Sequence, residues 1–315
     1  SRAEPGNEGL KTLHGVTVRA PCFAAVAGSD DGGLFGRNRL AMIGRSRLRR
    51  SVLRKGSRMQ LVVAIRLAVM MFLQFFIWGV WYVPMWPYLS GLGIAPEKIG
   101  FAYSATGIAA MLSPIFIGMV ADKFFPSQIV LGVLHVLGGV FLFLAANAAE
   151  WGSFFPLILA HLLCYMPTLA LVNSVLFQSV ADPQKDAPPI RTLGTIGWIV
   201  SGIVVGSSFL VGEEKAIVFQ VPQFLGGPEA PYDAIGMGLT NTPLLIGAAV
   251  SVLLGVFCFF LPNTPPKLKG QKTTIGDVIG LKAISLMRDR AFAVFIVCSL
   301  LICIPLSFYF QTANG

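Results

Sequence analysis

The chain has 315 residues, of which 55% are hydrophobic and only 12% are charged, and its mean hydropathy is +0.72. A soluble domain carries about 25% charged residues, so this composition excludes an ordinary soluble protein and indicates a polytopic membrane protein. The net charge of +9 does not indicate a nucleic-acid-binding fold, because residues 1–58 hold 12 of the 24 basic residues against 4 of the 15 acidic ones, and the rest is nearly neutral.

Residues 1–58 are predicted to form a disordered basic tail. The tail is not a secretory signal peptide, because the first long apolar stretch begins only after residue 59 and is too long. Two interpretations stay open. The segment is either a solvated tail that touches anionic lipid headgroups, or sequence upstream of a natural start at Met59.

Seven apolar runs follow the tail, each long enough to span a bilayer, which takes about 20 residues. They lie at residues 61–84, 100–121, 128–147, 153–177, 188–211, 243–262 and 291–312. The sequence therefore predicts an all-α membrane protein. We expect a six-helix bundle over 59–262, a connector at 263–290, and a truncated seventh transmembrane helix at 291–315.

Charges in the short loops predict the orientation of the spans, because Lys and Arg are enriched in cytoplasmic loops. The basic tail, the loops that contain Lys123 and Lys185, and the lysine-rich connector all fall on one side. The loops that contain Glu150 and Glu213 fall on the other. We therefore expect a multi-pass protein whose amino terminus lies in the cytoplasm.

The first and fourth spans contain polar residues with two open interpretations. Gln74 and Trp78 lie four residues apart on one helical face, where they either line a central cavity or contact a neighbouring helix. The same alternatives hold for Asn173. His135 and His161 are expected to form hydrogen bonds between helices rather than to carry protons.

The fifth run carries three polar or aromatic side chains on one face. At about 100° per residue, Arg191, Thr195 and Trp198 share a helical stripe, and Gly194 and Gly197 form an adjacent stripe suited to close helix packing. An ionisable residue within a span is costly and therefore indicates a functional site. The alternative is that Arg191 lies in the first helical turn and reaches the cytoplasmic surface.

Catalytic and metal-binding groups are not predicted in the spans. Every acidic residue after Met59 falls in a loop or at a helix end, and the spans contain no acidic dyad, Ser–His pair or HExxH motif. Four of the five cysteines lie in apolar runs and none forms a CxxC pair, so they are interpreted as small buried side chains. We expect neither an enzyme nor a bound metal or cofactor.

The order of six spans, a basic connector and a further span resembles the major facilitator superfamily, whose pattern has twelve spans. The stretch "GMVADKFF", residues 118–125, is similar to the superfamily's signature loop G-x-x-x-D-[RK]. The resemblance implies that Gly118, Asp122 and Lys123 form a conformational latch that stabilises the outward-facing state. It also implies that the chain holds the amino-terminal half and the start of the second half.

Four stretches indicate a particular family within this superfamily. They are "FLQFFIWGVWYVPMWPYL" from residue 72, "GIAAMLSPIFIGMVADK" from residue 107, "YMPTLALVNSV" from residue 165 and "PPIRTLGTIGWIVSG" from residue 188. Over residues 70–205 the chain resembles the bacterial nucleoside:proton symporters. This resemblance implies that Arg191 and Thr195 contact a nucleoside and that Trp198 lines the pocket. Gln74 and Trp78 are further candidates for the same site.

The seventh span is implied to contribute amides that bind substrate. Gln311 and Asn314 are the candidates, and Ser307 stands where one alignment of the family has a glutamine, which is a departure. The family's coupling acids are implied to lie in the second half. The expected partners are nucleosides, protons, the lipid bilayer and a complementary carboxy-terminal half.

The function that these observations predict is proton-coupled nucleoside uptake across the inner membrane by alternating access. We expect that the 315-residue chain does not transport alone, because one bundle cannot close the site. Two alternatives are a superfamily transporter of another small solute, such as a sugar or a drug, and a non-transporting membrane remnant that pairs with a second half.

Overall fold

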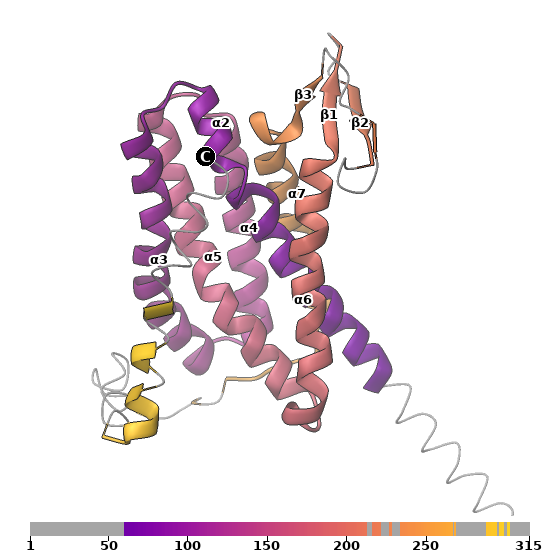
Figure 1. The fold of residues 1–315 in the computed structure, drawn as a ribbon. Helices are drawn as coiled ribbons and strands as arrows, with labels where there is room; N and C mark the ends of the chain where they lie inside the picture. Colours follow the sequence, from indigo (N-terminus) through magenta and orange to yellow (C-terminus); the bar gives the residue numbers. More distant parts are fainter. Residues whose placement is uncertain are drawn as a thin grey trace, which may run out of the picture. The chain divides into compact units, whose positions relative to one another are not determined.

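The computed structural model of the protein describes residues 60–212, 216–221, 227–228, 234–266, 268, 288–294, 296–298 and 301–302, except for the side chains at 114 and 115. Its elements are, in chain order, the helix at 60–82, α2 (Met85–Gly91), α3 (Pro96–Lys123), α4 (Ser127–Ala146), α5 (Trp151–Ser179), α6 (Pro183–Gly206), β1 (Ser208–Val211), β2 (Ala216–Phe219), β3 (Ile235–Gly236), η2 (Met237–Leu239), α7 (Thr242–Phe257) and η3 (Cys258–Phe260) (Figure 1).

Six helices in the described part of the chain are long and apolar enough to cross a membrane. They are Gln60–Gly91, Pro96–Lys123, Ser127–Ala146, Trp151–Ser179, Pro183–Gly206 and Thr242–Phe260. These helices correspond to the first six predicted spans, so the helical fold class is confirmed. Of the predicted seventh span, residues 291–294, 296–298 and 301–302 are described, and they are helical.

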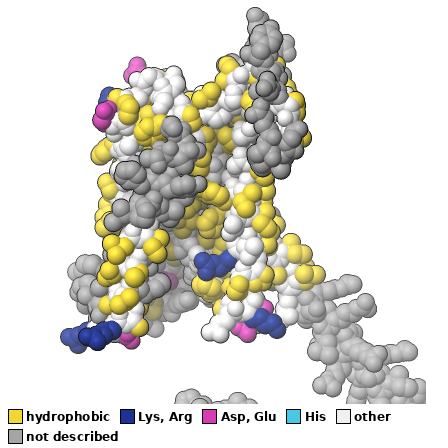
Figure 2. Space-filling view, in the orientation of Figure 1, with side chains coloured by type: hydrophobic (Ala, Val, Ile, Leu, Met, Phe, Trp, Pro, Cys, Tyr) yellow, Lys and Arg dark blue, Asp and Glu magenta, His cyan; other side chains and the backbone are white. Residues whose placement is uncertain are grey.

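The surface of the helices suits contact with lipid. On α4, the exposed side chains Val133, Leu137, Val140 and Leu144 recur at helical spacing, whereas the opposite face of the helix is buried. Figure 2 shows that most charged side chains on the visible face lie near its two ends, with hydrophobic and uncharged side chains between them. An apolar band between polar ends is the surface that a bilayer requires.

The first span is interrupted at Pro84, which has no backbone N–H to donate. The helix at 60–82 ends there, and α2 begins at Met85. The Tyr103 hydroxyl on α3 bonds both sides of the break, donating to the Tyr82 carbonyl oxygen at 2.8 Å and accepting from the Trp86 N–H at 3.2 Å. This tyrosine therefore satisfies backbone groups next to the interruption.

Small residues bring α6 close to the first helix. An added Cβ at Gly197 would overlap the Phe72 carbonyl oxygen, and one at Gly194 would lie 2.7 Å from the Phe75 ring. Gly194, Gly197 and Ser201 are all buried. The structure thus confirms the packing stripe predicted beside Arg191, and that stripe sets the distance between two walls of the cavity described below.

A buried polar network joins four helices. Gln74 on the first helix donates from Nε2 to Thr168 Oγ1 on α5 at 2.8 Å, and its Oε1 lies 2.8 Å from His135 Nε2 on α4. His135 Nδ1 lies 3.2 Å from Ser251 Oγ on α7. His161 Nδ1 hydrogen-bonds the Gly138 carbonyl oxygen at 2.8 Å. Both histidines therefore form the predicted bonds between helices.

The fifth span is shorter than predicted, because the helix ends at Gly206 and residues 208–211 form strand β1 rather than a further turn of helix. A three-stranded antiparallel sheet of order β2-β1-β3 follows, with Leu210 opposite Ile217 and Ile235. Figure 1 shows the sheet beyond the end of α6. Gly212 adopts a φ of 73°, which favours glycine at the turn after β1. The predicted span end at residue 211 is therefore wrong.

The chain that leaves η3 is attached to the start of α4. Gln128 Oε1 accepts hydrogen bonds from the backbone N–H and the hydroxyl of Thr264, at 2.9 and 2.5 Å, and its Nε2 donates to Asn263 Oδ1 at 2.9 Å. The Leu268 N–H donates to the Asp122 carbonyl oxygen at the end of α3, at 2.8 Å. The beginning of the predicted connector thus lies at the same end of the bundle as the loop that contains Lys123.

Candidate functional site

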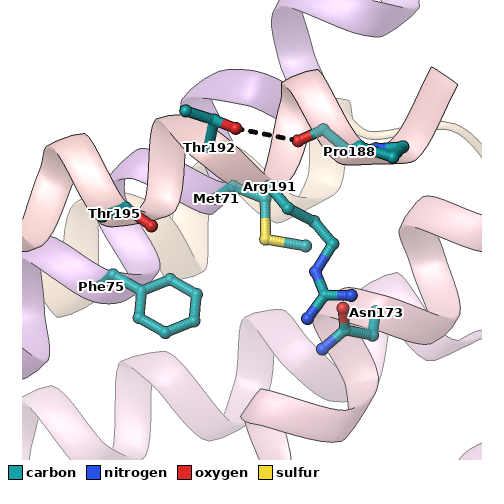
Figure 3. A pocket seen from close by; sticks show the side chains of 7 residues that line it. All are labelled: Met71, Phe75, Asn173, Pro188, Arg191, Thr192 and Thr195. Atoms are coloured by element: carbon teal, nitrogen blue, oxygen red, sulfur yellow. Dashed lines mark hydrogen bonds between the residues drawn. The ribbon is translucent and has the colours of Figure 1, made fainter.

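A cavity of about 250 Å³ lies between the first helix, α5 and α6. Its lining consists of two apolar side chains from the first helix, one amide from α5 and four residues from α6, namely Met71, Phe75, Asn173, Pro188, Arg191, Thr192 and Thr195 (Figure 3). Two of the seven predicted substrate-binding residues, Arg191 and Thr195, therefore line the same cavity.

The start of α6 is stabilised by its sequence. Asp182 is the N-cap, and its Oδ1 accepts from the N–H groups of Gln184 and Lys185 at 3.1 and 3.3 Å. The Thr192 hydroxyl donates to the Pro188 carbonyl oxygen at 3.1 Å, within the turn that contains both prolines. A regular helix from this cap places Arg191 and Thr195 one turn apart on the cavity side.

The cavity contains polar donors and acceptors between apolar walls. The Arg191 and Thr195 side chains are exposed, and no carboxylate is among the lining residues. The guanidinium provides hydrogen-bond donors only, and the threonine hydroxyl both donates and accepts. Met71 and Phe75, both from the first helix, provide apolar surface in the same lining. Such a lining suits a partly apolar ligand that carries hydrogen-bond acceptors for the guanidinium.

Trp198 and Trp78 form an aromatic contact rather than part of the cavity lining. Their ring centroids are 5.5 Å apart and the rings meet edge to face. Trp78 also lies against Tyr82 and Tyr165, with centroids 5.7 and 6.3 Å away. The predicted stripe on α6 therefore divides into a polar part at the cavity and an aromatic part next along the helix. The substrate contacts predicted for the two tryptophans stay predictions.

Gln74 is fully buried and does not line the cavity. Both ends of its amide have partners within the bundle, Thr168 and His135. In the described structure its side chain holds helices together, which is the second of the two interpretations considered above. Substrate contact by Gln74 stays a prediction.

The sequence left the role of Asn173 open and did not indicate Met71, Phe75 or Thr192 as site residues. Met71 and Phe75 are four residues apart on the first helix, a spacing that ordinary core residues also have. Only the packing of the first helix against α6 shows that they lie at a cavity.

Within the described residues, no group of three His, Cys, Asp or Glu side chains is placed to hold a metal ion.

The predicted latch lies at the end of α3. Asp122 and Lys123 are half-buried, and Lys123 Nζ lies 5.7 Å from the centre of the Phe124 ring. Among the described residues, an added Cβ at Gly118 would meet nothing within 4 Å. The latch function stays a prediction, and Gln311 and Asn314 lie outside the described residues.

Comparison with known proteins identifies the family. The model of the family described as nucleoside H+ symporter matches residues 61–225 and 231–315. The chain belongs to the nucleoside H+ symporter family. This family consists of transporters, which agrees with the expectation that the chain is not an enzyme, and the six apolar helices make it a multi-pass membrane protein.

Individual relatives match over most of the chain. It is 47% identical over 250 residues to the putative nucleoside transporter YegT of Escherichia coli (strain K12), covering 79% of this chain and 54% of the relative. It is 31% identical to the nucleoside permease NupG of the same organism, covering 76% and 52%. The chain thus spans about half the length of the curated relatives it matches.

A solved structure supports the same fold. The crystal structure of the nucleoside transporter NupG matches with a TM-score of 0.61 and 31% identity, covering 80% of this chain and 57% of that chain. This match, at an identity that also supports the family, confirms the predicted major-facilitator-type helix bundle.

Proposed function

We propose that this chain contributes a substrate-binding half of a nucleoside:proton symporter that works by alternating access in the inner membrane, with its amino terminus in the cytoplasm. The observation that carries the proposal is the cavity in which Arg191 and Thr195 face apolar surface, in a chain of the nucleoside H+ symporter family.

The chemistry of the cavity fits a nucleoside. The Arg191 guanidinium can donate to ribose hydroxyls or to base carbonyl oxygens, and Thr195 can pair with either kind of group. Phe75 offers an aromatic surface to the base. A volume of about 250 Å³ lies below the roughly 300–1,000 Å³ of complete ligand pockets, which supports a site that needs residues from a second half.

The remaining predicted residues have roles in the same proposal. Trp78 and Trp198 would meet the ligand as it moves along α6, and Gln311 and Asn314 would add amides from the seventh span. Proton coupling requires a titrating group in the pathway. Because the cavity lining holds no carboxylate, the coupling acid is assigned to the complementary carboxy-terminal half.

Binding of nucleosides to the purified chain in lipid nanodiscs tests the proposal. Uridine should bind, and Arg191→Ala should weaken binding roughly 10- to 100-fold, the effect of removing a hydrogen bond from a charged group. Lys185→Ala is the matched control, because it removes an exposed positive charge from the same helix outside the cavity. Absence of uridine binding, or equal binding by Arg191→Ala, would overturn the proposal.

Uptake into proteoliposomes tests the expectation that one bundle cannot complete the cycle. The chain alone should show no proton-driven uridine uptake, and co-reconstitution with a carboxy-terminal half from a relative should restore it. If a sugar or a drug competes for binding and nucleosides do not, the substrate class is wrong while the transporter fold stands.

A further inference from the structure

Asn173 on α5 holds an amide with one free end. Its Nδ2 donates to the Leu169 carbonyl oxygen one turn earlier, at 2.8 Å. This bond determines which end of the amide is nitrogen. The other end, Oδ1, is buried and has no hydrogen-bond partner among the described residues. A buried acceptor without a donor is unfavourable, so this oxygen is available to accept a hydrogen bond from a donor that approaches it.

Arg191 lines the same cavity as Asn173 and carries hydrogen-bond donors. Figure 3 shows the Asn173 oxygen directed toward the guanidinium, which comes from the facing helix α6. The Thr192 hydroxyl is already bonded to the Pro188 carbonyl oxygen, and Thr195 lies on the far side of the cavity from Asn173. A guanidinium has five N–H groups, so one can go to Oδ1 while the others remain for a ligand.

We propose that Asn173 is a positioning residue for Arg191. When a ligand occupies the cavity, Oδ1 accepts one guanidinium N–H and holds the remaining donors across the cavity toward the ligand. The inference rests on the proposed function, because it requires that Arg191 contacts the ligand. In the occupied cavity the bond to Oδ1 fixes the orientation of this long, exposed side chain and offsets part of the rotamer entropy that the side chain loses on binding.

The choice of an amide rather than a carboxylate has a physical reason. A carboxylate at this position would pair with the guanidinium through two charge-assisted hydrogen bonds and would neutralise it. A neutral oxygen orients the guanidinium with a single weaker bond and leaves its charge and most of its donors available. Asn173 therefore suits a site in which Arg191 donates hydrogen bonds to the ligand.

A double-mutant cycle on uridine binding to the full chain in nanodiscs tests this inference. Asn173→Leu keeps the size of the side chain and removes the acceptor, and we expect binding to weaken roughly 3- to 10-fold. In the Arg191→Ala background the same substitution should have no further effect. Asn173→Asp should also weaken binding, because the carboxylate retains the guanidinium.

Two further variants separate positioning from a merely structural role. Gln178→Leu removes another amide from α5, one that donates to Ser174 Oγ at 2.9 Å outside the cavity, and it should bind uridine as the wild type does. Asn173→Thr can still donate to the Leu169 carbonyl oxygen but is too short to reach Arg191. It should reproduce the loss seen with Asn173→Leu, and it covers the case in which the leucine variant does not fold.

The outcomes distinguish this inference from the proposed function. If the wild type does not bind uridine, or if Arg191→Ala binds equally well, the proposed function fails first. If Arg191→Ala weakens binding while Asn173→Leu and Asn173→Thr bind normally, the positioning role is overturned and the proposed function stands. Equal losses from Asn173→Leu with and without Arg191 would also overturn it, because the two residues would then act independently.

Discussion

Replacing Gly197 by alanine tests the packing that places the two walls of the cavity. An added Cβ would overlap the Phe72 carbonyl oxygen and would lie 3.0 Å from its carbonyl carbon and 3.2 Å from its Cα. These are backbone atoms and cannot rotate away. The variant therefore has to move α6 away from the first helix, and with it Arg191 and Thr195 away from Phe75.

The expected magnitude follows from two opposing effects. Overpacking of a close contact costs about 1–3 kcal/mol, whereas alanine is a better helix former than glycine by about 1 kcal/mol. Gly202→Ala is the matched control, because Gly202 lies in the same helix and an added Cβ there meets nothing within 4 Å. Since both variants gain the same propensity, the difference between them isolates the steric cost of about 1–3 kcal/mol.

Thermal unfolding with a thiol-reactive dye measures this difference. Cys258 is fully buried and becomes reactive when the bundle opens. Soluble domains of 150–250 residues lose roughly 2–4 °C of melting temperature per kcal/mol, so Gly197→Ala should melt roughly 2–12 °C below Gly202→Ala. Equal melting temperatures for the two variants would refute the argument that helix contact at Gly197 sets the width of the cavity.

Two further substitutions test the buried polar contacts. Gln74→Leu removes the partner of His135 Nε2 and should lower the free energy of unfolding by about 1 kcal/mol, within the range for hydrogen bonds between membrane helices. The same dye assay measures this loss. An unchanged melting temperature would contradict a stabilising role of the buried polar network. Gln128→Leu should release the segment around Thr264, so trypsin should cut faster at Lys267 in limited proteolysis. Gln178→Leu is the control there, and equal cutting rates would show that Gln128 does not hold the connector.

Element by element, the sequence predicted the helices better than the site. Span length and apolar composition are local properties, so all six spans within the described residues were found from hydropathy. The strand β1 was not, because residues 208–211 are as apolar as the helix before them. Its formation depends on pairing with β2 and β3, and those partners come from later in the chain.

The site shows the same division between local and distant effects. Arg191 and Thr195 are one helical turn apart, so helix geometry alone placed them together. Gln74 is a polar residue within a span, as a cavity residue would be. Its amide nevertheless hydrogen-bonds His135 and Thr168, which lie on two other helices. Whether a polar side chain in a span faces a cavity or a neighbour depends on the rotation of that helix in the bundle.

By itself, the sequence determined that this chain is a membrane helix bundle of the nucleoside H+ symporter type and that α6 has a polar stripe beside a stripe of small residues. Only the tertiary structure decided which helices meet that stripe. Helical periodicity relates residues within a segment, whereas the approach of Asn173 to Arg191 and of Phe72 to Gly197 depends on contacts between segments far apart in the chain. Those contacts shape the cavity, because backbone and side chains from three helices have to fit together at once.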